Sequence, residues 1–381
     1  MFTCFFSRVY ISAMLAYTSI CSTFDSAIFG GSSGTLSQYF HVGTEVAELS
    51  STLYIIGYAS GPLIWAPFSE LRGRRLPIII SMLGFGIFNT GVATGKDIQT
   101  VMICRFFAGI FGSCPLAVVA AIFSDMYNNR TRGSAIAVFS STVFLGPLLA
   151  PFISGFINMS YLKWRWTAYI PSFMGYFAFA INLLFLKESY APVVLIDKAV
   201  ELRRRTKNWG IHAKQEEIEV DFRQLLIYNF SRPVRMHISE PVILAVTVYL
   251  SFIYGLLYCF LAAFPLVFQE VYHFNAGESG LTLFGIVVGL LMGGTFIIWT
   301  ASGYNKKLDA HGGVPVPEWR LPPVILGGAL FAIGLFWFGW TGFTKRIHWL
   351  SPTFAGVPVG FGLLVIFVQL FNYLIDTYLA L

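Results

Sequence analysis

The sequence predicts an all-α polytopic membrane protein, and two observations lead to that fold class. Of the 381 residues, 56% are hydrophobic and only 12% are charged, and the mean hydropathy is +0.69. Ordinary soluble domains are about 25% charged, so lipid must solvate most of this chain's surface. The apolar residues are also gathered into long runs, and a helix needs about 20 of them to cross a bilayer.

Ten runs are predicted to cross the membrane as helices. They lie at residues 9–31, 50–69, 77–95, 98–123, 134–157, 166–186, 242–268, 279–301, 322–342 and 352–375. The first run is too long for a signal peptide and lacks a small-residue cleavage site. Because a polar segment follows the sixth run, we predict an N-terminal six-helix bundle (1–186), a partly helical cytoplasmic linker (187–239) and a C-terminal bundle of four helices (240–381).

The basic residues predict the orientation of these helices. With a cytoplasmic N-terminus, 19 of the 25 Lys and Arg fall on the cytoplasmic side, five fall on the other side, and Arg105 lies within a span. This distribution follows the positive-inside rule. The connector Arg72-Gly73-Arg74-Arg75 contributes three of the cytoplasmic charges within four residues. The net charge of +6 therefore marks orientation, and no nucleic-acid partner is expected.

Two ionisable residues lie inside predicted spans, where such groups are costly and are functional candidates. Asp25 in the first span and Arg105 in the fourth both lie roughly 9–10 Å below the outer surface, at 1.5 Å per residue. Equal depth predicts an Asp25–Arg105 interaction or a shared polar cavity; the alternative is that each reaches the interface separately. Asp25 could carry protons, because burial favours its neutral form and a nearby arginine favours its charged form. Glu240 and Asp376, at span ends, are expected to be solvated flanking charges.

The fifth span contains two prolines four residues apart. Pro147 and Pro151 remove backbone donors, so a bend is expected. Gly146, Ala150 and Gly155 give the same helix a face that permits close packing. Such a helix suits a rocking motion, although a static kink explains the pattern equally well.

Aromatic residues within the seventh span and two residues near the end of the tenth are candidates for a substrate cavity. They are Tyr249, Tyr254, Tyr258 and Phe264 in the seventh span and Asn372 and Tyr373 in the tenth. Packing against lipid or other helices is the competing explanation for such a stripe.

Common enzyme motifs are absent from the sequence. There is no P-loop, no His-Glu-x-x-His and no Gly-x-Ser-x-Gly, so neither ATP-driven pumping nor common hydrolase chemistry is expected. The five cysteines form no Cys-x-x-Cys pair, and we expect no metal and no cofactor.

Three motifs follow one another along the predicted spans. They are Ala66…Glu70-Leu71-Arg72-Gly73-Arg74-Arg75 after the second span, Arg105-Phe106-Phe107-Ala108-Gly109 in the fourth, and Gly146 to Gly155 in the fifth. With these motifs in this order, the chain resembles the major facilitator superfamily, and within it the fungal drug:proton antiporters with twelve spans. Ala66 and Glu70 replace the glycine and aspartate usual in the first motif. The resemblance implies two six-helix bundles around a central cavity, and also a cytoplasmic latch of Arg74 with Asp125, with Glu70 and Arg132 nearby. It further implies that spans eleven and twelve are missing, so the chain is predicted to be truncated after its tenth span.

These observations predict a multi-pass protein of the cell membrane, a monomer whose partners are the lipid bilayer, a small organic substrate and protons. The predicted function is proton-coupled export, by alternating access, of a drug, toxin, secondary metabolite or polyamine. One alternative is uptake or facilitated diffusion. Another is a truncated, nonfunctional or regulatory membrane protein derived from such a transporter; a membrane enzyme is the third.

Overall fold

The computed structural model describes residues 5–127, 129–213, 216, 231, 235–312, 314 and 316–378, and within them it contains helices and no strands. The first half holds α1 (Phe5–Ile28), η1 (Gly30–Ser32), α2 (Ser33–Phe40), α3 (Thr44–Ser60), α4 (Pro62–Arg72), α5 (Arg75–Thr94), α6 (Ile98–Gly112), α7 (Cys114–Met126), α8 (Asn129–Met159) and α9 (Trp166–Phe185). The rest comprises α10 (Ala191–Thr206), α12 (Pro241–Leu266), η3 (Val267–Val271), α13 (Ala276–Leu281), α14 (Phe284–Ala310), η4 (Pro317–Arg320), α15 (Leu321–Gly342) and α16 (Leu350–Tyr378).

Eight helical segments in the described part of the chain are long and apolar enough to cross a membrane, which confirms the predicted all-α membrane fold. They are Arg75–Thr94, Ile98–Met126, Gly133–Met159, Trp166–Phe185, Pro241–Val271, Ala276–Ala310, Pro317–Gly342 and Leu350–Tyr378. The first two of the ten predicted spans are not among them. Serine and threonine dilute the apolar residues of α1, and the second predicted span divides at Gly61-Pro62 into α3 and α4. Both segments nevertheless pack lengthwise within the bundle, α1 along α8 and α9 and α3 along α6.

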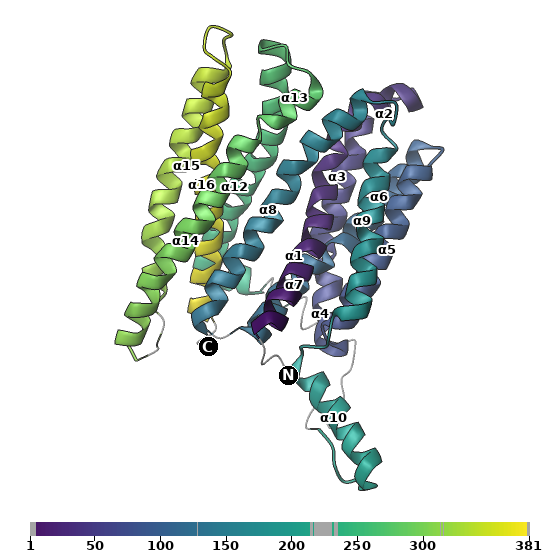
Figure 1. Ribbon diagram of the computed structural model, residues 1–381, viewed down its shortest axis with the longest axis vertical. Helices are drawn as coiled ribbons and strands as arrows, with labels where there is room; N and C mark the ends of the chain where they lie inside the picture. Colours follow the sequence, from purple (N-terminus) through teal and green to yellow (C-terminus); the bar gives the residue numbers. More distant parts are fainter. Residues whose placement is uncertain are drawn as a thin grey trace.

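The helices form two groups that meet along α8 (Figure 1). Helices α1 to α9 form one group and α12 to α16 the other, and α8 contacts α1 on one side and α13 and α14 on the other. We call the end of the molecule that carries α10 the linker end, and the end that carries α2 and α13 the far end (Figure 1). A residue on α8 can therefore contact both groups, which makes this helix central to any relative motion.

Glycines bring α3 and α6 into direct backbone contact. A Cβ atom at Gly57 would collide with the carbonyl oxygen of Phe106, and one at Gly109 would collide with that of Tyr54. Small residues at such positions let membrane helices approach closely. The close approach places the ring of Tyr54 beside Arg105, which is one turn from Gly109 on α6.

The part of the predicted linker that the structure describes contains α10, which projects beyond the linker end of the bundle (Figure 1). Its last turn carries Arg203, Arg204 and Arg205, as suits the negative end of a helix dipole. Arg203 also pairs with Glu216 at 2.5 Å. Residues 191–206 within the predicted linker segment are therefore helical.

Candidate functional site

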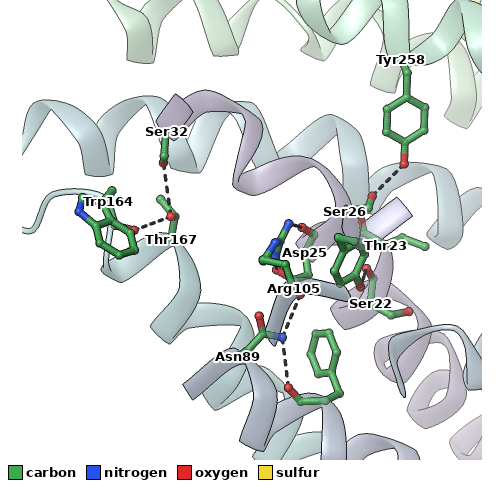
Figure 2. Close-up of polar contacts among 12 residues, drawn as sticks. Ser22, Thr23, Asp25, Ser26, Ser32, Asn89, Arg105, Trp164, Thr167 and Tyr258 are labelled. Atoms are coloured by element: carbon green, nitrogen blue, oxygen red, sulfur yellow. Dashed lines mark hydrogen bonds and ion pairs between the residues drawn. The ribbon is translucent and has the colours of Figure 1, made fainter. Parts of the chain in front are cut away.

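A fully buried ion pair lies between α1 and α6. The guanidinium of Arg105 donates from Nη1 to Asp25 Oδ1 at 2.7 Å and from Nη2 to the carbonyl oxygen of Asp25 at 3.1 Å (Figure 2). Both side chains are 0% exposed. The predicted Asp25–Arg105 contact is therefore present, and the alternative of two separately solvated charges is wrong.

Neutral groups complete the surroundings of this pair. Asn89 on α5 donates from Nδ2 to Asp25 Oδ2 at 2.9 Å, so the carboxylate has a partner on each oxygen (Figure 2). The Arg105 guanidinium lies over the rings of Phe29 and Tyr54, 4.5 Å from each ring centroid. Aromatic faces attract cations, so the rings offset part of the cost of removing the arginine from water.

Not every polar atom around this pair has a hydrogen-bond partner. Among the described residues, Arg105 Nε and Asn89 Oδ1 are buried without a hydrogen-bond partner. Removing one member of a buried ion pair leaves an uncompensated charge and costs about 3–5 kcal/mol. Protonating Asp25 would remove its charge without removing its side chain. The arrangement can therefore respond to a proton, although its role in proton coupling stays a prediction.

The residue next to Asp25 connects this pair to the other group of helices. Ser26 on α1 and Tyr258 on α12 are hydrogen-bonded through their hydroxyl oxygens at 2.9 Å (Figure 2). Tyr254 lies one turn away on α12, with its ring 5.4 Å from that of Tyr258 and 6.0 Å from that of Phe144 on α8. Two of the predicted cavity residues, Tyr254 and Tyr258, thus lie where the two groups meet.

The other predicted cavity residues lie elsewhere. Phe264 is fully buried and stacks on Phe338 of α15 at 4.6 Å, which is a packing role within one group. Tyr249 is 39% exposed. Asn372 is buried and Tyr373 half-buried near the end of α16. The four aromatic residues therefore do not line one cavity, because they are spread around the circumference of α12 and along its length.

The small residues of the fifth predicted span serve both groups of helices. A Cβ atom at Gly146 would collide with Thr23 Oγ1 and lie 2.8 Å from the backbone nitrogen of Phe24, and Ala150 is buried against α1. On the other side, a Cβ atom at Gly155 would collide with the carbonyl oxygen of Ala276 in α13. Helix α8 continues through Pro147 and Pro151 without interruption. The motif makes α8 a closely packed spacer between α1 and α13.

The arginine-rich connector forms a polar cluster at the linker end. Arg74 Nε lies 3.7 Å from Asp125 Oδ2 on α7, and Arg74 Nη1 donates to Ser69 Oγ at 2.7 Å. The same guanidinium lies 4.8 Å from the ring centroid of Tyr190. Glu70 is exposed on α4 and takes no part in this ion pair. The side chain of Arg132 lies outside the described residues.

Glu188, which was not among the residues predicted from the sequence, holds this connector in place. Its Oε1 accepts from the backbone N–H of Arg74 at 2.9 Å and its Oε2 from that of Arg75 at 3.1 Å. Gly73 adopts φ +85°, which favours glycine, and a Cβ atom there would collide with the Glu188 carboxylate. Glu188 therefore caps the first turn of α5, where a carboxylate also complements the helix dipole. The only sequence signal was an acid just after an apolar span.

Replacing Glu188 by alanine is expected to lower the free energy of unfolding by about 1–3 kcal/mol, because hydrogen bonds to a charged group are lost. Thermal unfolding of the purified chain in detergent measures the effect. The control is Glu201→Ala, which removes an exposed ion pair with Arg205 on α10. Equal shifts for the two variants would contradict the capping role.

A second buried charge pair at the linker end corrects another expectation. Arg320 Nε donates to Asp376 Oδ2 at 2.9 Å, and the Tyr304 hydroxyl donates to the same oxygen at 2.8 Å. The side chain of Asp376 is only 15% exposed, so it is not a solvated flanking charge. Glu240 does remain exposed, and it accepts a hydrogen bond from Tyr378 at 3.2 Å. The error arose because Arg320 lies far from Asp376 in sequence.

Comparison with known proteins identifies close relatives. A family model of the Major Facilitator Superfamily matches residues 15–380. The chain is 46% identical over 367 residues to the uncharacterized transporter C36.03c of Schizosaccharomyces pombe, covering 96% of this chain and 68% of that protein. It is 43% identical over 374 residues to the Major facilitator superfamily multidrug transporter FLU1 of Candida albicans, covering 98% and 61%. It is also 43% identical over 375 residues to the Multidrug transporter TPO1_2 of Candida glabrata, covering 98% and 64%.

The chain thus spans about two thirds of the length of these relatives. The family match runs to residue 380 and gives no support to the predicted truncation after a tenth span. Solved structures share the fold. They include the proton:xylose symporter XylE, with a TM-score of 0.64 at 16% identity over 97% of this chain and 81% of that one. The human organic anion transporter MFSD10 gives 0.59 at 14% identity, over 96% and 85%.

Proposed function

Given that the chain belongs to the major facilitator superfamily, we propose that it is a proton-coupled secondary transporter that exports small organic compounds by alternating access. The observation that carries this proposal is the buried Asp25–Arg105 pair, which lies one residue from a contact between the two groups of helices. A transporter rather than an enzyme fits both the family and the names of its relatives.

Coupling would begin at Asp25. In the described state its carboxylate is held by Arg105 and Asn89. When a proton neutralises Asp25, the attraction to Arg105 falls, and α1 is free to move relative to α6. Because Ser26 is the next residue on α1, this movement strains or breaks its hydrogen bond to Tyr258. Proton binding would thus change the balance between two arrangements of the helix groups, as a ligand does when it prefers one of two states.

Charged groups at the linker end would bias the same balance from the other side. Arg74–Asp125 ties the start of α5 to α7 within the first group, and Arg320–Asp376 ties η4 to α16 within the second. Arg320 also lies near α8 of the first group, since a Cβ atom built at Gly133 would be 3.8 Å from its Nη1. The Arg320–Asp376 pair therefore lies beside the contact between the groups, where a charge pair can shift a two-state equilibrium.

The membrane arrangement follows from the distribution of charge. We place the linker end in the cytoplasm, with the N-terminal bundle at 1–186, the linker at 187–239 and the second bundle at 240–381. The cell membrane and a monomeric state complete the proposal. The substrate is a drug-like organic compound, supported by the relatives named multidrug transporters and by the aromatic residues Tyr254 and Tyr258 at the contact between the groups.

Export from vesicles tests the proposal. Vesicles containing the purified chain are loaded with a fluorescent drug, and its release is followed with and without a pH gradient across the membrane. The gradient is expected to accelerate release several-fold, and collapsing it with a protonophore should abolish the difference. Release that is equally fast in all conditions would leave facilitated diffusion as the better account.

A further inference from the structure

One face of α16 packs against α15 with a period of seven residues. A Cβ atom at Gly362 would lie 2.7 Å from Phe331 Cβ, and Ala355, seven residues earlier, lies beside Gly334. Asp376, fourteen residues after Gly362, contacts Arg320 immediately before α15. Positions seven apart share a face of an α-helix, so Gln369 lies on this face midway between two contacts with α15.

Two polar side chains are buried in this region. Gln369 is 3% exposed and Asn372 is 4% exposed. Val365, seven residues before Asn372, packs against both neighbouring helices. Its side chain would lie 3.2 Å from a Cβ atom at Gly327 on α15 and 3.5 Å from a Cβ atom at Gly293 on α14. Asn372 therefore lies on the side of α16 where α14 and α15 meet.

Neither side chain has its full set of hydrogen bonds within the described part of the chain. The Oε1 atom of Gln369 and the Nδ2 atom of Asn372 are buried without partners. Because α16 and α15 run in opposite directions, Gln369 faces the first turn of α15. That turn contains Pro322 and Pro323, which carry no backbone N–H. The opposing backbone thus offers few donors to Gln369 Oε1.

The two groups are suited to one bridging molecule. Residues three apart on a helix are neighbours, about 5–6 Å between Cβ atoms. Gln369 lacks a donor and Asn372 lacks an acceptor, and a water molecule supplies both. One turn nearer the linker end, Asp376 with Arg320 and Tyr304 continues the line of polar groups toward the surface. Buried polar atoms in membrane proteins are costly when unpaired, and buried waters commonly satisfy them.

We propose that Gln369 and Asn372 bind ordered water between α14, α15 and α16, forming the inner end of a hydrated polar track that reaches the linker end at Asp376. This track is separate from the Asp25–Arg105 pair, and it does not depend on the proposed transport function. It explains why two polar residues on one side of a membrane helix remain buried. The interface between α14, α15 and α16 would then contain bound water. Its contacts could rearrange by exchanging that water rather than by breaking direct hydrogen bonds.

Water-edited solid-state NMR of the chain in lipid bilayers tests this proposal through the side-chain N–H groups. Magnetisation from water is expected to reach the Asn372 NH₂ several times faster than the indole N–H of Trp65. Trp65 is the control, because it is buried and its single N–H already donates to the carbonyl oxygen of Ile110 at 2.8 Å. Equal transfer rates for the two side chains would overturn the proposal.

A variant of Gln369 tests whether the water near Asn372 is also bound by Gln369. Gln369→Leu removes one partner of the water, and the transfer to Asn372 is expected to slow by at least half. Asn372→Leu assigns the signal. Phe371→Leu, at an exposed position next to Asn372 but on another face of α16, should leave the transfer unchanged. Unchanged transfer in Gln369→Leu would contradict the bridge, and the comparison within the unaltered chain stands even if that variant fails to fold.

Discussion

Replacing Arg105 by glutamine is expected to abolish transport and to lower the free energy of unfolding by about 3–5 kcal/mol. The loss is large because Asp25 is 0% exposed and would keep a charge with no cation beside it. Asn89 alone cannot replace the ion pair, since it supplies one N–H to one carboxylate oxygen. Thermal unfolding in detergent and drug release from vesicles measure the two effects. Lys96→Gln, at an exposed position, is the control.

The double variant Asp25→Asn with Arg105→Gln separates pairing from independent roles. If the charges act as a pair, removing both leaves no uncompensated buried charge, so the double variant should be more stable than Arg105→Gln alone. A coupling energy of about 0.5–3 kcal/mol is typical of groups in direct contact. Losses that simply add would contradict the coupling between Asp25 and Arg105.

The second large effect is expected at Gly155. A valine there would force its Cβ against the carbonyl oxygen of Ala276, so α8 and α13 would have to separate at the far end. Overpacking costs about 1–3 kcal/mol, which corresponds to a shift of about 5–150-fold between two states. We therefore expect transport to fall by about 5–150-fold, with the protein still inserted and folded.

A matched glycine makes this result interpretable. A Cβ atom at Gly339 on α15 would meet nothing within 4 Å, so Gly339→Val should retain transport. Normal transport in Gly155→Val would show that the close approach of these helices is not needed for the cycle.

The sequence predicted those features that lipid imposes on single segments. The long apolar runs of α5 to α9 and α12 to α16 were predicted because each run must satisfy the bilayer by itself. The Asp25–Arg105 contact was also predictable, since two charges at equal depth in a membrane have a strong reason to pair. Positions that break a helix, such as Gly61-Pro62, were less clear, because the apolar pattern continues through them.

Contacts between distant segments could not be predicted in the same way. Glu188 caps α5 across more than a hundred residues, and Arg320 reaches Asp376 on a neighbouring helix. Each side chain alone is typical of a solvated residue at a membrane surface. The aromatic stripe failed for a related reason: Phe264 and Tyr258 lie on the same helix but face different neighbours, Phe338 and Ser26.

The most direct test of the account compares two modes of transport in Asp25→Asn, which keeps the size of the side chain but not its charge. Vesicles are assayed for drug exchange at equal pH and for drug accumulation driven by a pH gradient. If Asp25 carries the coupled proton, exchange should persist while gradient-driven accumulation falls to the level of empty vesicles. Accumulation at the wild-type rate in Asp25→Asn would contradict the central claim and place proton coupling elsewhere in the molecule.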